Sequence, residues 1–269
     1  MKTVLITGAS KGIGRATAIL FSQKGWNVAA AVREIDTEEQ YPENVCPFII
    51  DIRDRESINR CIEQVVNYYG RVDLLVNNAG VYSTSPLECI SEEDLDNVIQ
   101  TNVKGTLYMT QAMLPYFRTN KGGTIVNISS IAGRVTFPFQ SVYHTSKWAI
   151  EGLSESLYYE LKNLKIKVKI VEPGMVHTSL YRSVLDMSAK RFPMEYRENF
   201  AHWHSYLINN YENGYDPILD ARRVYQAASD RSSRLRYTSD SSTKFVLILR
   251  RIFPTCILQR LIYSICKLK

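Results

Sequence analysis

Short apolar runs alternate with longer amphipathic stretches along most of the chain. The short runs are rich in Val, Ile and Ala and end in Gly, Asn, Ser or a carboxylate, which is typical of buried strands. They predict strands at 3–7, 27–32, 46–51, 72–80, 123–130 and 166–174, with a seventh at 235–240. Apolar residues at helical spacing predict helices at 14–25, 54–70, 91–117 and 143–163. This alternation predicts an α/β fold: a Rossmann-like, doubly wound parallel sheet with helices on both faces.

One stretch, from about 175 to 222, breaks the alternation and is rich in aromatic residues. We expect it to form a partly helical lid over a site at the carboxyl ends of the strands, where such sheets bind ligands. The lid's aromatic side chains favour an apolar small-molecule substrate, although many of them could simply pack the lid onto the sheet. The whole chain, 1–269, is then one domain with an inserted lid.

The first predicted strand runs into the sequence TGASKGIG, residues 7–14. Gly8, Gly12 and Gly14 allow a tight turn and a close approach of the backbone to a pyrophosphate. The helix that follows offers unpaired N–H groups and the positive end of its dipole. The spacing Gly-x-x-x-Gly-x-Gly differs from the GxGxxG fingerprint, but its place at the first strand–helix junction predicts a dinucleotide site.

The end of the second strand indicates which dinucleotide is bound. An acid is expected there for the ribose hydroxyl of NAD, but the chain has Val32 followed by Arg33. An arginine suits a 2′-phosphate, and Lys11 in the glycine loop could reach the same group. We therefore favour NADP(H) over NAD(H). Glu34 and Asp36 keep NAD open if the strand ends later.

The sequence SVYHTSK, residues 141–147, offers two candidate acid/base groups. His144 has an unperturbed pKa near neutrality, whereas Tyr143 ordinarily titrates near 10. Lys147 lies four residues after Tyr143, so both side chains lie on one helix face, where the ammonium favours the phenolate and should lower the tyrosine pKa. The next residue in a helix is turned by about 100°, so His144 should point away and serve in packing.

Six motifs occur in a fixed order along the chain: TGASKGIG, NNAG (77–80), Asn102, SS (129–130), YHTSK (143–147) and PGMVHT (173–178). In this respect the chain resembles the short-chain dehydrogenase/reductase family over roughly residues 1–180. The resemblance implies an oxidoreductase that moves a hydride between a nicotinamide cofactor and a ketone or secondary alcohol. It places the catalytic residues at Asn102, Ser130, Tyr143 and Lys147.

Each residue of this set has an expected role. Ser130, thirteen residues before Tyr143 as in the family, would donate to the substrate oxygen, and Tyr143 would act as general acid/base. Lys147 could also bond the nicotinamide ribose, and Asn102 would hold a water behind it. The glycine loop and the resemblance together predict the cofactor-binding residues. These are Gly8, Ser10, Lys11, Gly12, Ile13, Gly14, Arg33, Asp51, Ile52, Asn77, Ala79, Gly80, Tyr143, Lys147, Pro173, Gly174, Val176 and Thr178.

The positive charge of the chain is concentrated at its end. Residues 231–269 hold nine Lys and Arg against one Asp, a net charge of +8, whereas the whole chain carries +6. Because the rest of the chain is close to neutral, we expect no nucleic-acid partner. The apolar and basic tail, about 244–269, either packs on the domain or a sister subunit, or lies on an anionic membrane surface.

The remaining features set the expected partners and compartment. Five scattered cysteines, without CxxC spacing, and the lone His202-x-His204 pair predict neither a disulfide framework nor a metal site. We expect a cytoplasmic protein with an option of peripheral membrane contact, because no secretory signal pattern is visible. The resemblance makes a homo-oligomer plausible. A catalytically idle nucleotide sensor or scaffold, or an epimerase or dehydratase on the same fold, are the rival functions.

Overall fold

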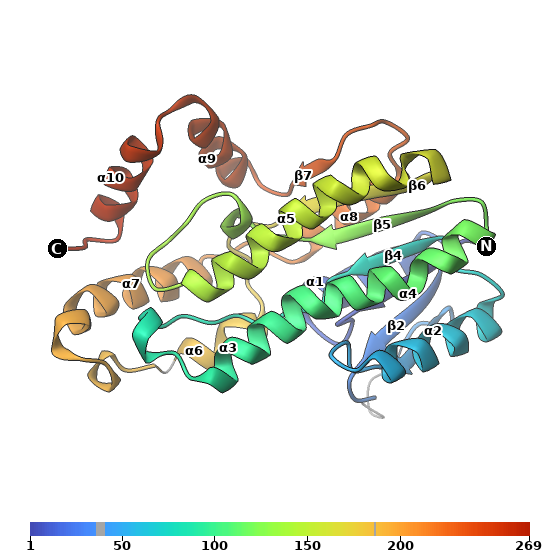
Figure 1. The fold of residues 1–269 in the computed structure, drawn as a ribbon, viewed down its shortest axis with the longest axis horizontal. Helices are drawn as coiled ribbons and strands as arrows, with labels where there is room; N and C mark the ends of the chain where they lie inside the picture. Colours follow the sequence, from blue (N-terminus) through green and yellow to red (C-terminus); the bar gives the residue numbers. More distant parts are fainter. Residues whose placement is uncertain (36–40, 186) are drawn as a thin grey trace.

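The computed structural model describes residues 1–35, 41–185 and 187–269 and contains one seven-stranded parallel sheet (Figure 1). The strands are β1 (Thr3–Thr7), β2 (Asn27–Val32), β3 (Val45–Ile49), β4 (Leu74–Asn77), β5 (Gly123–Ile128), β6 (Ile166–Glu172) and β7 (Arg236–Thr238). Their order is β3-β2-β1-β4-β5-β6-β7, so the chain winds outward in both directions from β1 and β4. All seven predicted strands and the doubly wound fold are confirmed.

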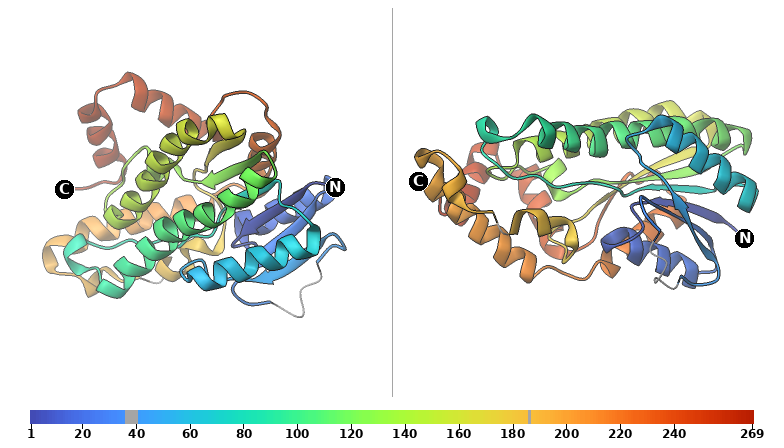
Figure 2. Two further views of the ribbon diagram at one scale, coloured as in Figure 1. Left: turned by 45° about the vertical axis from the view of Figure 1, so that its right-hand side comes forward. Right: turned by 90° about the horizontal axis from the view of Figure 1, so that it is seen from below.

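Helices cover both faces of the sheet, and the alternation of side chains along each strand explains why. Leu5 packs into one core with α2 (Arg55–Tyr69), whereas its neighbours Val4 and Ile6 face the other core. The first core also takes α4 (Thr106–Thr119) and α5 (Ser141–Leu161). The second takes α1 (Gly12–Gln23) and α8 (Ile218–Ser229), which pack against each other. Figure 2 shows these layers from below.

The helix predicted over 91–117 is helical throughout, but its hydrogen-bonding pattern changes in the middle. It begins as α3 (Glu92–Val98), where the Ser91 hydroxyl accepts a hydrogen bond from the Asp94 N–H at 3.0 Å. A π-helical turn, η2 (Ile99–Gly105), then separates α3 from α4. Such turns commonly mark functional positions, and this one contains Asn102.

The predicted lid region is largely helical. It contains η5 (Ser179–Tyr181), α6 (Arg182–Leu185), η6 (Ala189–Arg191) and α7 (Met194–Glu212). The buried aromatics of α7, Phe200 and Trp203 among them, form a third core with Tyr82 and Tyr143. The predicted end of the lid at 222 falls within α8, which belongs to the helical layer of the sheet.

The tail forms two helices, α9 (Ser241–Ile252) and α10 (Thr255–Ile265), separated at Pro254 (Figure 1). Three further short turns are η1 (Leu87–Cys89), η3 (Ile131–Gly133) and η4 (Lys162–Leu164). Among the described residues, no helix has the length and apolar character that crossing a bilayer requires.

Candidate active site

A cavity of about 620 Å³ opens at the carboxyl ends of the strands, around the point where the strand order reverses. Most of the residues predicted from the sequence line it. They are Gly8, Ser10, Lys11, Gly12, Ile13, Arg33, Asp51, Ile52, Ala79, Gly80, Ser130, Tyr143, Lys147, Pro173, Gly174, Val176 and Thr178. The structure therefore brings segments from six strand ends to one hollow.

The glycine loop has the geometry that its spacing predicts. Gly8 and Gly12 have φ of +66° and +57°, which favour glycine. Gly14 does not line the cavity. A Cβ there would stand 2.2 Å from the Gly8 carbonyl oxygen, so Gly14 lets α1 begin directly against the loop. The N-terminus of α1 thus faces the cavity, as pyrophosphate binding requires.

One predicted cofactor residue, Asn77, does not reach the cavity. Its side chain is buried, and its Nδ2 donates to Thr110 Oγ1 at 3.1 Å and Asn127 Oδ1 at 2.9 Å. Asn78 lines the cavity instead, and its Nδ2 donates to the Thr7 and Gly8 carbonyl oxygens at 2.9 and 3.1 Å. Successive side chains at the end of a strand point to opposite sides. Asn78 therefore takes the position at the cavity that was predicted for Asn77.

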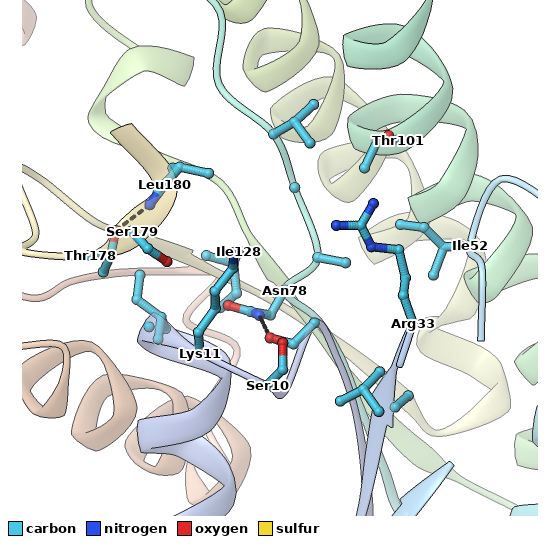
Figure 3. Close-up of a pocket in the computed structure, with 18 of the residues that line it drawn as sticks. Ser10, Lys11, Arg33, Ile52, Asn78, Thr101, Ile128, Thr178, Ser179 and Leu180 are labelled. Carbon is cyan, nitrogen blue, oxygen red and sulfur yellow. Dashed lines mark hydrogen bonds between the residues drawn. The ribbon is translucent and has the colours of Figure 1, made fainter. Parts of the chain in front are cut away.

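Two cationic side chains point into the cavity from different elements. Figure 3 shows the Arg33 guanidinium above the end of β2 near Ile52 and Thr101, and the Lys11 side chain rising from the glycine loop. Val32 is the last residue of β2 and lines the cavity, but its apolar side chain offers no hydrogen bond to a ribose hydroxyl. Glu34 also lines the cavity, whereas Asp36 lies outside the described residues.

Tyr143 and Lys147 occupy one face of α5 and are both buried. The Lys147 Nζ lies 5.8 Å from the centroid of the Tyr143 ring and donates to the Ile128 carbonyl oxygen at 3.0 Å. That bond ties α5 to the end of β5, which carries Ser130. The pair and the serine therefore meet at one wall of the cavity.

The expected lowering of the Tyr143 pKa is wrong for the protein as the structure shows it. Burial raises the pKa of Tyr143 to about 12, and the neighbouring Ser130 hydroxyl lowers it only in part. Burial also lowers the pKa of Lys147 to about 8, against a smaller opposing effect of Glu151. Removal from water disfavours the charged form of each group, and it is the largest effect on both pKa values.

His144 is buried and points away from the Tyr143–Lys147 face, as its helical position predicts. Its Nε2 accepts a hydrogen bond from the Phe137 N–H at 2.7 Å, so its Nδ1 donates to the Ala132 carbonyl oxygen, also at 2.7 Å. Burial lowers the pKa of this imidazole. His144 therefore braces the loop between Ser130 and α5 as a neutral ring.

Asn102 stands behind the cavity rather than in its wall. Its Nδ2 donates to the Val81 carbonyl oxygen at 2.9 Å and to Ser146 Oγ at 3.0 Å, and its Oδ1 accepts from the Val81 N–H at 2.8 Å. It thereby fixes the segment after β4 against α5. The water relay expected for Asn102 stays a prediction.

A chain of aromatic rings extends outward from Tyr143. The Tyr82 ring packs edge-on at 4.8 Å from Tyr143, and Tyr181 lies 4.7 Å from Tyr82. Tyr211 follows at 5.5 Å from Tyr181, and His177 stacks on it at 4.9 Å. The aromatic composition of the lid anticipated Tyr181 and Tyr211. It did not anticipate Tyr82, which follows the NNAG motif with no periodic signal of its own.

The His202-x-His204 pair is used for packing. His202 Nδ1 lies 2.7 Å from the Lys267 carbonyl oxygen, and His204 Nε2 lies 2.8 Å from that of Val184. Within residues 1–35, 41–185 and 187–269, no cluster of three or more His, Cys, Asp or Glu side chains could hold a metal ion.

Known proteins resemble the chain in both sequence and fold. A family model described as short chain dehydrogenase matches residues 2–189. The 3-oxoacyl-[acyl-carrier-protein] reductase FabG of Thermotoga maritima is 39% identical over 186 residues, 66% of this chain and 76% of its own. A 3-ketodihydrosphingosine reductase of Bacteroides thetaiotaomicron is 34% identical over 216 residues, 80% of this chain and 78% of its own.

Solved structures extend the likeness beyond the motifs. A short-chain dehydrogenase from Streptomyces avermitilis superposes with a TM-score of 0.79 at 30% identity, covering 99% of this chain and 95% of its own. ElxO with NADP bound superposes with a TM-score of 0.74 at 28% identity, covering 91% of this chain and 99% of its own. The likeness therefore includes the lid and most of the tail.

Proposed function

This chain belongs to the short-chain dehydrogenase family of oxidoreductases, and we propose that it transfers a hydride between NADP(H) and a ketone or secondary alcohol. One observation carries the proposal. Ser130, Tyr143 and Lys147, from the end of β5 and from α5, meet at a nucleotide-sized cavity whose opposite rim is the glycine loop.

The residues present fit a nicotinamide dinucleotide. The close contact between Gly14 and Gly8 leaves a cradle of backbone for the diphosphate at the start of α1. Arg33 and Lys11 supply positive charge for a 2′-phosphate, and Val32 leaves no acid for a bare ribose. Structural relatives were solved with NADP, NAD or NADH bound, so the choice of NADP rests on Arg33 and Lys11. When bound, the nicotinamide supplies or accepts the hydride.

The protein's own part is to hold the substrate oxygen and to move a proton. Ser130 donates a hydrogen bond to that oxygen, and Tyr143 gives it a proton during reduction. With a pKa of about 12, Tyr143 holds this proton at neutral pH, as a general acid must. The Lys147 ammonium then stabilises the phenolate that remains.

An apolar substrate fits the surroundings of the reacting centre. Beyond Tyr143, the wall includes Leu180 and Tyr181, and the Tyr82 ring packs behind them against Tyr143 and Tyr181. The described part of the cavity has no charged side chain there. Two relatives are named as reductases of acyl or long-chain base compounds, which supports a lipid-like ketone. The proposal also includes that the protein is a cytoplasmic homo-oligomer and that residues 244–269 make a peripheral contact with a membrane.

A direct assay tests the reaction and the cofactor together. Ketones of lipid, steroid and retinoid type, with small polar sugars for comparison, are mixed with enzyme and NADPH or NADH, and absorbance follows turnover. We expect kcat/KM to be about 30-fold or more higher with NADPH, since a charged hydrogen-bond partner is at stake. Arg33→Ala should remove most of this preference, and a preference of the native protein for NADH would contradict NADP.

The Tyr143→Phe variant separates catalysis from binding. It should lose turnover while still binding NADPH, measured by fluorescence titration, because only the hydroxyl is removed. A native protein that binds NADPH but turns over none of the compounds would instead favour the idle sensor or scaffold. Good activity on sugars alone would contradict the apolar substrate.

A further inference from the structure

The outer side of the two tail helices carries an unusual share of exposed apolar side chains. Nineteen large apolar residues are exposed in the described part of the chain, and eight of them fall between residues 245 and 265. They are Phe245, Ile248, Ile252, Phe253, Ile257, Leu261, Tyr263 and Ile265, each 42–67% exposed. A concentration of this kind marks an interaction surface rather than scattered exposure.

Helical spacing arranges most of these residues in stripes. Phe245, Ile248 and Ile252 lie at i, i+3 and i+7 of α9, and so share one face. Ile257, Leu261 and Ile265 of α10 repeat every four residues and form a second stripe. The residues of α10 that pack inward, Leu258 and Ile262, lie on the neighbouring side of that helix, and Cys266, directly after the helix, is buried as well. The apolar arc of α10 is thus wider than its contact with the domain.

The tail is fastened to the domain at both ends. At its start, Asp240 accepts a hydrogen bond from the Thr243 N–H at 2.8 Å, and both side chains pack against Gly174 in the loop after β6, residues 173–178. At its end, Asn199 of α7 exchanges two hydrogen bonds with Lys269, at 2.8 and 3.1 Å. The tail is therefore held at both ends, and its packing on the domain leaves the residues of the outer stripes exposed.

The charge around the stripes selects the partner. Residues 241–269 contain six basic residues and no acidic one. The six are Lys244, Arg250, Arg251, Arg260, Lys267 and Lys269. A second copy that docked through the same face would bring like charges together, whereas an anionic lipid surface complements them.

We propose that α9 and α10 dock flat on an anionic bilayer, with their outer apolar stripes in the headgroup–acyl boundary and their basic residues on the lipid phosphates. The inference deepens the peripheral contact in the proposed function and does not depend on the reaction. Because the tail begins against the loop after β6 and ends on the lid helix α7, docking also fixes the orientation of the proposed active site relative to the membrane.

Vesicle co-sedimentation of the full chain tests this. Vesicles are phosphatidylcholine alone, or phosphatidylcholine with about a third phosphatidylserine. We expect binding to the anionic vesicles only, with strong weakening near 1 M salt, where the screening length falls to about 3 Å. Lys244→Glu with Arg251→Glu should weaken binding about 30-fold or more. Phe245→Ser with Ile248→Ser and Ile252→Ser should abolish binding even at low salt.

Controls separate docking from general stickiness and from the enzyme's reaction. Tyr68→Ser with Leu87→Ser and Leu164→Ser removes three exposed apolar side chains elsewhere and should leave binding unchanged. NADPH turnover of a soluble ketone, measured without vesicles, should be equal in all variants, which shows that they are folded. Equal binding of the native and triple-serine tail proteins would overturn the proposal. A second outcome would also overturn it. If the native protein binds no vesicles, and the triple-serine tail variant has a lower mass in light scattering than the native protein, a second copy of the chain covers the stripes.

Discussion

At the scale of single residues, Tyr143 and Lys147 show how strongly burial governs a proton-transfer site. The sequence places a cation one helical turn from a phenol and so predicts a lowered tyrosine pKa. The structure removes both groups from water, and the pKa values move toward the neutral forms, to about 12 for Tyr143 and about 8 for Lys147. In the proposed reaction, Tyr143 therefore keeps its proton until a substrate oxygen takes it.

This assignment predicts a pH dependence of the reduction. Below pH 8 Lys147 is charged and stabilises the phenolate that forms, and as pH rises through about 8 that charge is lost. We expect kcat/KM for ketone reduction to fall above pH 8. The decrease should approach tenfold for each further pH unit. The profile should be flat between pH 6 and 7.5, because His144 is buried as the neutral ring. A step near pH 6.5 in stopped-flow or steady-state rates would contradict the assignment.

A second prediction concerns His144 itself. In His144→Ala the Phe137 N–H and the Ala132 carbonyl lose their partners, which should lower the free energy of unfolding by about 1–3 kcal/mol. The rate should fall because the loop after Ser130 loosens, but the shape of the pH–rate profile should not change. Chemical denaturation and a pH series measure the two effects, and a lost ionisation in the variant would identify His144 as an acid/base after all.

At the scale of elements, local patterns determine most of what could be read from the sequence. The apolar runs, the glycine turn and the Tyr143–Lys147 spacing are local, and the structure has each of them. The π-turn η2 could not be read in this way, because its distinguishing contacts, from Asn102 to Val81 and Ser146, join segments that are distant in the chain. Asn77 was misplaced for a similar reason, since the register of a strand end decides which of two neighbouring side chains faces the cavity.

The π-turn gives the third prediction. Asn102→Ala leaves the N–H and the carbonyl oxygen of Val81 without their hydrogen-bond partner. The segment after β4 should then be held less firmly against α5, and kcat/KM should fall about tenfold or more. Asn102→Asp keeps the acceptor for the Val81 N–H but loses the donor, so its activity should be intermediate. Asn97→Ala, in the preceding α3, is a matched control and should be close to native. Equal activity of Asn102→Ala and the native protein would exclude this positioning role.

At the scale of the whole molecule, one buried carboxyl group joins the separate layers. Asp220 at the start of α8 accepts hydrogen bonds from the Tyr215 hydroxyl at 3.1 Å and from Ser239, just after β7. The Tyr215 hydroxyl in turn accepts from the Gly174 N–H at 3.0 Å. The loop after β6, the segment between α7 and α8, and the segment between β7 and α9 thus meet at a group that is inaccessible to solvent.

Burial raises the pKa of Asp220 to about 7, and its hydrogen bonds to Ser239 and Tyr215 lower it only in part. The folded protein then binds this proton more tightly than the unfolded chain does. The contribution of Asp220 to the free energy of unfolding is therefore largest below pH 4, and it is lost as pH rises toward 7. The loss is limited to about 4 kcal/mol, the equivalent of about three pKa units.

Asp220→Asn tests this linkage as the fourth prediction. The amide keeps an oxygen for both donors and places its NH2 at Oδ2, which accepts no hydrogen bond from the described residues. Its melting temperature relative to the native protein should therefore rise between pH 5 and pH 8, by about 2–4 °C for each kcal/mol. Glu172, whose pKa burial also raises to about 7, is present in both proteins and cancels from the difference. A difference that stays constant across this range in scanning calorimetry would show that Asp220 is ionised in the folded protein throughout, and that the hydrogen bonds rather than burial set its charge.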